Sequence, residues 1–125
     1  MSCINTTVFA AENDGVSTCA NNSSRTNTVF SIDDNGLATV IVSYVGYEGI
    51  TSCGIISIKI QKRFLLAFWQ DVDGGAWTDY SSDVSYINSH SISVKSGTYR
   101  VQVEYQIYGT GGDTDIITEE NQAKN

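Results

Sequence analysis

The fold is decided by Gly97-Thr98-Tyr99-Arg100-Val101-Gln102-Val103-Glu104-Tyr105-Gln106-Ile107-Tyr108-Gly109, a stretch in which apolar and polar side chains alternate between two glycines. Successive side chains of a β-strand point to opposite faces, so this period predicts a strand with one face in the core and one in water. An α-helix would spread the same apolar residues around its whole circumference. The side chains expected to point inward are Tyr99, Val101, Val103, Tyr105 and Ile107.

Turn signals separate this strand from similar segments. Asp33-Asp34-Asn35-Gly36 predicts a hairpin turn, because Asn-Gly accepts the positive φ that tight hairpins require. Phe64–Gln70 is apolar on both faces, which predicts a central strand covered on both sides or, alternatively, a surface that meets something. Residues 71–79 are interpreted as a loop. The other expected strands are 28–32, 37–45, 55–61, 84–87, 91–94 and 115–118.

This succession of short strands predicts an all-β domain. We expect an antiparallel two-sheet β-sandwich, immunoglobulin-like or fibronectin-III-like, with about seven to eight strands. The absence of proline fits uninterrupted sheet hydrogen bonding. A chain of 125 residues suits one domain. We predict a polar N-terminal segment (1–27), the β-sandwich (28–118) and a charged tail (119–125) that frays.

Charge and hydropathy exclude some partners. The net charge of −7 argues against a nucleic acid, because that affinity comes largely from Lys and Arg. A small basic cluster, Lys59, Lys62 and Arg63, is interpreted as a solvated turn. No apolar run approaches the length of about 18 residues that spans a membrane, so no membrane insertion is expected.

The N-terminal third and the cysteines indicate the compartment. The polar, Asn/Ser/Thr-rich start is typical of a mature secreted protein, so we expect an extracellular chain from which a signal peptide has been removed. The three cysteines, Cys3, Cys19 and Cys53, lack the CxxC spacing of zinc or thioredoxin-type sites. Either Cys3–Cys19 or Cys19–Cys53 could form one disulfide, with a slight preference for the latter because Cys53 precedes a strong strand. Three reduced thiols are the alternative.

Ser96-Gly97-Thr98-Tyr99-Arg100-Val101 resembles the start of strand F in immunoglobulin-like domains, where a tyrosine bonds back across a corner of the sandwich. Valine stands at Val101, where antibody domains have a cysteine, so the disulfide between the sheets is missing. The resemblance therefore implies a disulfide-free immunoglobulin-like or fibronectin-III-like sandwich.

A second resemblance covers most of the chain from Asn35 to Ile117. The pattern is similar to that of small secreted proteins of Gram-positive anaerobes, grouped as a domain of unknown function. That family implies secretion and a β-sandwich, and it implies no activity. The resemblance rests on Asn35-Gly36-Leu37-Ala38, Ser43-Tyr44-Val45-Gly46, Ile58-Lys59-Ile60-Gln61-Lys62-Arg63, Phe68-Trp69, Gly97-Thr98-Tyr99-Arg100-Val101, Gly109, Gly112-Asp113 and Asp115-Ile116-Ile117.

Few residues are candidates for catalysis. A Ser-His-Asp arrangement would need His90, the single histidine, which we expect to face solvent; no G-x-S-x-G elbow accompanies it. The acidic stretch with Asp71, Asp73 and Asp79 offers oxygen ligands for Ca²⁺, although the EF-hand pattern fails because Gly75 occupies the third ligand position. A calcium module or a small hydrolase are thus minor alternatives, and no cofactor is predicted.

Three aromatic residues could make contacts. Trp77, Tyr80 and Tyr47 would supply rigid amphipathic area for a sugar or a protein, unless Trp77 folds back over the end of the sandwich, which we favour. The function expected is a secreted, non-enzymatic binding or structural β-sandwich that contacts an extracellular protein or glycan. The main alternative is a self-associating module, a homo-oligomer joined by edge strands or by Phe64–Gln70.

Overall fold

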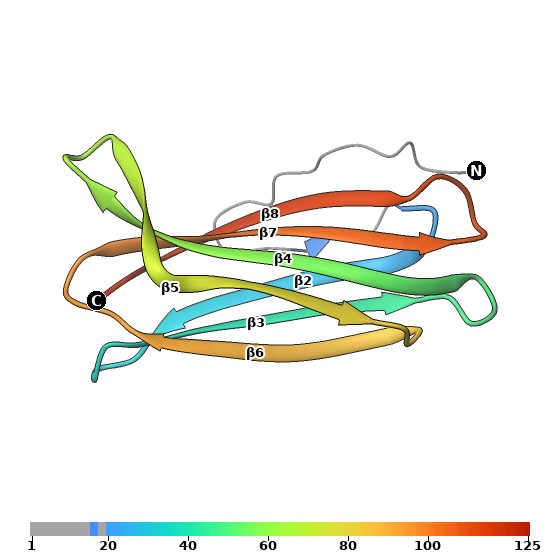
Figure 1. Cartoon of the computed structure of the whole chain (residues 1–125), viewed down its shortest axis with the longest axis horizontal. Helices are drawn as coiled ribbons and strands as arrows, with labels where there is room; N and C mark the ends of the chain where they lie inside the picture. Colours follow the sequence, from blue (N-terminus) through green and yellow to red (C-terminus); the bar gives the residue numbers. More distant parts are fainter. Residues whose placement is uncertain (1–15, 18–19) are drawn as a thin grey trace.

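The computed structural model describes residues 16–17 and 20–125, which form two antiparallel sheets without a helix among them. One sheet has the order β1-β2-β3-β6 and the other β5-β4-β7-β8 (Figure 1). The β-sandwich prediction is confirmed. The strands are β1 (Val16–Ser17), β2 (Ser23–Ile32), β3 (Leu37–Gly46), β4 (Thr51–Phe64), β5 (Phe68–Ser81), β6 (Ser85–Ser93), β7 (Thr98–Gly109) and β8 (Asp115–Lys124).

Hairpins within each sheet and connections between the sheets link the strands. The β2–β3 hairpin lies in one sheet, the β4–β5 hairpin in the other, and β6 returns to pair with β3. The strand that decides the fold, β7, lies between β4 and β8. At its start, the Tyr99 hydroxyl donates a 2.8 Å hydrogen bond to the Lys95 carbonyl. This is the corner that the resemblance to strand F implied.

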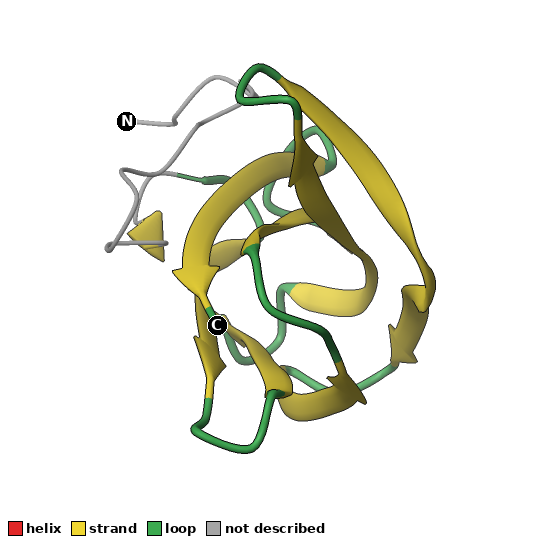
Figure 2. Ribbon diagram, turned by 90° about the vertical axis from the view of Figure 1, so that its left-hand side faces the viewer, coloured by secondary structure: helices red, strands yellow, loops and turns green. Residues whose placement is uncertain are grey.

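The core lies between the two sheets, which Figure 2 shows end-on. Inward side chains alternate with outward ones along β3, β4 and β7, as the period of two requires. Gly54 occupies one inward position of β4 because the ring of Tyr44 fills the space: a Cβ there would lie 2.8 Å from the Tyr44 Cε2 atom. The fully buried apolar side chains include Val40, Val42, Tyr44, Ile60, Val101, Tyr105 and Ile107.

The predicted boundaries at both ends of the sandwich are wrong. The first long strand begins at Ser23, and β8 continues to Lys124 through the segment expected to be a frayed tail. Glu119 is fully buried in this segment and accepts hydrogen bonds from the hydroxyls of Thr26 and Thr28. A carboxylate is buried only where hydrogen-bond donors offset the cost of its desolvation. The donors to Glu119 lie on β2, far away in the sequence, so the charged residues 119–125 resembled a solvated tail.

The expected loop over residues 71–79 is also wrong, because it is the middle of β5. The register with β4 shifts between Lys59 and Gln61, opposite Gly74, whose φ is +76°. Such a bulge bends a strand and needs a glycine at the positive φ. The glycines and aspartates of residues 71–79 therefore give this part of β5 the composition of a turn.

The apolar segment Phe64–Gln70 is not a covered central strand, the first of its two predicted roles. It forms the tip of the β4–β5 hairpin, which rises out of the sheet at the upper left of Figure 1. Phe64, Leu65, Leu66 and Phe68 are exposed, whereas Trp69 is half-buried. The expected strands 84–87 and 91–94 are one continuous strand, β6, which runs through His90.

The two seams between the sheets differ. At one seam β2 packs against β8 along much of its length. Asn121 donates a 2.7 Å hydrogen bond across it to the Thr28 carbonyl, and the Tyr105 hydroxyl donates one to the Asn27 carbonyl. At the other seam the edge strands β5 and β6 approach more sparsely.

Candidate functional site

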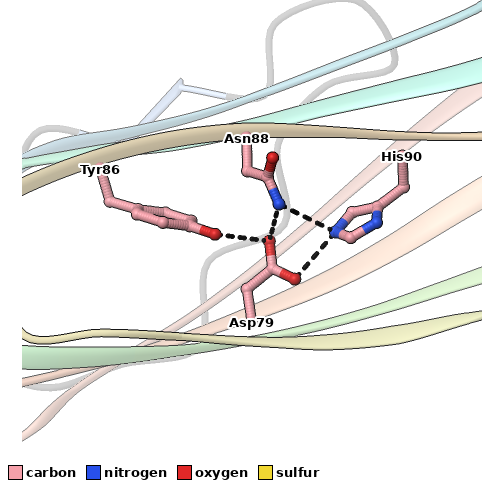
Figure 3. A network of polar contacts seen from close by, with 4 residues as sticks. All are labelled: Asp79, Tyr86, Asn88 and His90. Carbon is pink, nitrogen blue, oxygen red and sulfur yellow. Dashed lines mark hydrogen bonds and ion pairs between the residues drawn. The ribbon is translucent and has the colours of Figure 1, made fainter.

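A polar cluster lies at the sparse seam between β5 and β6. Asp79 of β5 is 8% exposed, and its carboxylate faces Tyr86, Asn88 and His90 of β6 (Figure 3). The Tyr86 hydroxyl and the Asn88 amide donate to Oδ2 at 3.1 and 3.0 Å. The His90 Nε2 atom lies 2.8 Å from Oδ1. Three side chains of one sheet thus bind one carboxylate of the other.

His90 does not face solvent, so that prediction is wrong. Its imidazole stacks on the Trp77 ring, with the ring centroids 4.8 Å apart and the planes 17° from parallel. Trp77 packs against the core from within β5, in register with Ile58, rather than over the end of the sandwich. The His90 Nε2 atom also lies 3.4 Å from the side-chain nitrogen of Asn88.

The cluster keeps Tyr86 in its neutral form. Burial raises the pKa of the Tyr86 phenol, and the hydrogen bond to Asp79 and the charge of that carboxylate raise it further. Tyr86 therefore stays a hydrogen-bond donor well into the alkaline range. This chemistry suits a structural link between sheets.

The three calcium candidates are not brought together. Asp71 pairs in register with Gln61, whereas Asp79 pairs with Ile56, five residues away on β4. Asp71 and Asp73 are exposed, and the buried Asp79 is engaged by the donors of β6. In the part of the chain that the structure describes, no group of three or more acidic, histidine or cysteine residues could hold a metal ion.

Cys53 is half-buried on β4. Its two candidate partners, Cys3 and Cys19, lie outside the described residues. The disulfide pairing therefore stays a prediction.

A second site lies on the outer face of the β5-β4-β7-β8 sheet. A groove of about 600 Å³ crosses all four strands there. Its floor is one cross-strand row in which Thr78 pairs with Ser57, Ser57 with Glu104, and Glu104 with Thr118. The next row consists of Ala76, Lys59, Gln102 and Glu120. Short side chains at both ends of the floor leave the space that forms the groove.

Hydrogen bonds hold the polar side chains around the groove. Gln102 donates to the Glu120 carboxylate at 3.0 Å, and Gln106 donates to Glu104 at 2.9 Å. The Arg100 Nη1 atom lies 3.4 Å from Oε2 of Glu120, and the Arg100 Nε–H group donates to Oε1 of Gln61 at 2.8 Å. Such fixed donors and acceptors lose little conformational freedom when a ligand binds.

Aromatic side chains flank these rows. Tyr80 is 74% exposed and pairs in register with Ile55, in the row next to the groove floor. Trp69 lies at the other end of the sheet, with the Arg100 guanidinium 4.4 Å from its ring centroid. Tyr47 is exposed in the β3–β4 turn, outside this face.

Sequence reasoning named Tyr80, which lies beside the groove, but missed the residues that line the groove. Gln102 and Glu104 belong to the face of the 97–109 strand that was expected only to lie in water. The signal was the outward half of the alternation along residues 97–109, but sequence alone does not indicate which strands lie beside β7.

Neither a protein-family model nor a curated protein matches the sequence. Among solved structures, the chain is similar to a beta-glucosidase from Listeria innocua in complex with gluconolactone, with 10% identity and a TM-score of 0.44 over 80% of this chain. The same protein in complex with glucose gives 11% identity and a TM-score of 0.44 over 77% of this chain. This chain spans 16% and 15% of those two chains. No helix among the described residues is long and apolar enough to cross a membrane.

Proposed function

We propose that this protein is a non-enzymatic binding module that acts outside the cell and binds a glycan on the outer face of the β5-β4-β7-β8 sheet. The observation that supports this proposal is the groove of about 600 Å³. Its volume is within the range of about 300–1,000 Å³ that is typical of ligand sites. The extracellular location rests on the polar, Asn/Ser/Thr-rich N-terminal composition.

The chemistry of the groove suits a sugar. A pyranose ring presents hydroxyl groups around its edge and C–H groups on its faces. Glu104, Gln102 and Lys59 offer acceptors and donors for the hydroxyls, and Tyr80 offers an exposed ring for a sugar face. Because the groove crosses all four strands and is open, it suits a segment of an oligosaccharide.

Binding rather than catalysis is proposed because the polar cluster and the groove lie on opposite faces of the sheet. Trp77 and Asp79 point toward β6, whereas Thr78 and Tyr80 point outward. The His90 imidazole therefore does not reach a ligand in the groove.

The experiment is a glycan array with the full chain, followed by calorimetry with the best oligosaccharide. Tyr80→Ala and Glu104→Gln should each weaken binding at least about tenfold, which corresponds to about 1.4 kcal/mol. Tyr47→Ala removes an exposed tyrosine outside the sheet face and should leave affinity unchanged. Silence across the array, or equal losses for Tyr80→Ala and Tyr47→Ala, would contradict the proposal.

A further inference from the structure

The tip of the β4–β5 hairpin exposes four large apolar side chains that follow one another closely in the chain. Phe64 is 52% exposed, Leu65 70%, Leu66 87% and Phe68 63%. They are contiguous in space because Phe64 pairs with Phe68 across the two strands. The tip projects beyond the rest of its sheet (Figure 1). Exposed apolar patches of this kind mark interaction sites.

The backbone conformation of the tip indicates that its two leucines have a functional role. Leu65 and Leu66 have φ values of 51° and 69°, in the left-handed region that leucine rarely adopts. Hairpin turns normally place glycine, asparagine or aspartate at such positions. Two leucines therefore strain the turn, and strained residues cluster at functional sites.

Charged and aromatic residues flank the apolar tip on both sides in the sequence. Arg63 and Lys62 come directly before Phe64, and Trp69 follows Phe68. The Lys62 ammonium lies 5.7 Å from the centroid of the Tyr99 ring. No acidic residue occurs between Lys62 and Gln70, and the next one, Asp71, accepts a hydrogen bond from Gln61 at 2.8 Å.

We propose that this hairpin tip inserts shallowly into the surface of a bilayer that contains anionic phospholipids. Aliphatic side chains at the apex would enter the acyl region, and the phenylalanines and Trp69 suit the interfacial layer. Lys62 and Arg63 would lie at the level of the anionic headgroups, where each cation adds to the attraction. The sequence predicted no membrane insertion because no segment is long enough to span, and a shallow tip needs no spanning segment.

A second copy of the chain fits this tip less well. A two-fold dimer places the same patch on both subunits, so Lys62 and Arg63 would face their own counterparts. A stable interface also uses about 20–30 residues on each side. The tip offers four large apolar side chains on a narrow hairpin.

The test is sedimentation of the full chain with vesicles of phosphatidylcholine alone or of phosphatidylcholine and phosphatidylglycerol in equal parts. We expect binding to the anionic vesicles that weakens as salt is added, and a severalfold loss for Arg63→Gln. The double variant Leu65→Asn with Leu66→Gly supplies the residues that the turn favours. It should raise the melting temperature while reducing vesicle binding at least tenfold.

The matched control is Ile87→Asn, because Ile87 on β6 is an equally exposed aliphatic residue away from the tip, at 72%. Its vesicle binding should equal that of the parent chain. The proposal is overturned if anionic vesicles do not bind, if Ile87→Asn loses as much as the tip variant, or if the tip variant retains binding. It is also overturned if ultracentrifugation shows a dimer that the tip variant dissociates, because the occupant is then a second copy.

Discussion

His90 and Asp79 form a 2.8 Å contact between edge strands of opposite sheets. The two side chains are 17% and 7% exposed, so water screens their interaction only partly. A double-mutant cycle with His90→Ala and Asp79→Ala should give a coupling free energy of about 1–3 kcal/mol from urea unfolding. The exposed pair Thr39 and Ser91, 2.9 Å apart between β3 and β6, is the control and should couple by less than about 0.5 kcal/mol. Equal coupling for the two pairs would show that the seam gains nothing from Asp79.

Gly54→Ala should destabilise the fold through one close contact. The new Cβ would lie 2.8 Å from Cε2 of the buried Tyr44 ring, and overpacking of a core costs about 1–3 kcal/mol. Ser57→Ala, at an exposed position of the same strand, should change the unfolding free energy by no more than about 0.5 kcal/mol. Thermal and urea unfolding measure both variants. Unchanged stability of Gly54→Ala would mean that Tyr44 can move aside freely.

Stability should fall in alkali because of Tyr105. Burial, followed by the nearby Glu119 charge, raises the pKa of its phenol above the ordinary 10.0. The folded state thus holds the proton more tightly than the unfolded chain, so this stabilisation is complete below pH 10 and is lost as the pH rises above it. The slope should approach about 1.4 kcal/mol per pH unit above pH 10.

Tyr105→Phe separates this titration from the rest of the protein. It should lower stability near neutrality by about 1–2 kcal/mol, because the hydroxyl donates to the Asn27 carbonyl. Its alkaline decline should be shallower, with Tyr44 and Tyr86, whose pKa values burial also raises, still contributing. Parallel stability curves for parent and variant above pH 10 would contradict the assignment to Tyr105.

Glu119 and Glu120 offer a matched pair of adjacent glutamates on opposite faces of β8. Glu119→Ala leaves the Thr26 and Thr28 hydroxyls without the acceptor they share and should cost at least about 2 kcal/mol. Glu120→Ala removes partly exposed contacts with Arg100 and Gln102, and should cost less than about 1 kcal/mol. Chemical denaturation of both variants checks this. Near-zero costs for both would indicate a frayed C-terminal segment after all.

The alternation along residues 97–109 was sufficient to predict β7, because a period of two is a local property of the chain, and the succession of such strands and turns predicted the β-sandwich. The resemblance of residues 96–101 to strand F implied that Tyr99 lies at a corner of the fold, where its hydroxyl donates to the Lys95 carbonyl. The prediction of a loop over residues 71–79 was wrong for two reasons. This segment belongs to an edge strand, which pairs on one side only and so tolerates aspartates. Its bulge also requires a glycine, which is a typical turn residue.

The candidate site was less accessible to sequence reasoning. Had β6 been interpreted as continuous, Tyr86, Asn88 and His90 would have shared one face by the same alternation. The carboxylate that they face comes from a different sheet, and nothing local in sequence indicates that contact. The threonine hydroxyls that donate to Glu119 lie more than 90 residues away in the chain, which explains why residues 119–125 resembled a solvated tail.

The unequal seams determine where the molecule opens first. The β2–β8 side is closed by buried side chains and hydrogen bonds between sheets, whereas the β5–β6 side has sparser contacts, among them Asp79 and the three β6 side chains that contact its carboxylate. Local opening of the native state should therefore begin with the separation of β5 from β6, while β2 and β8 stay packed and serve as the hinge. Amide protons of the edge strands would then exchange with deuterium well before those of β7, and a protease would find its earliest cut on that side.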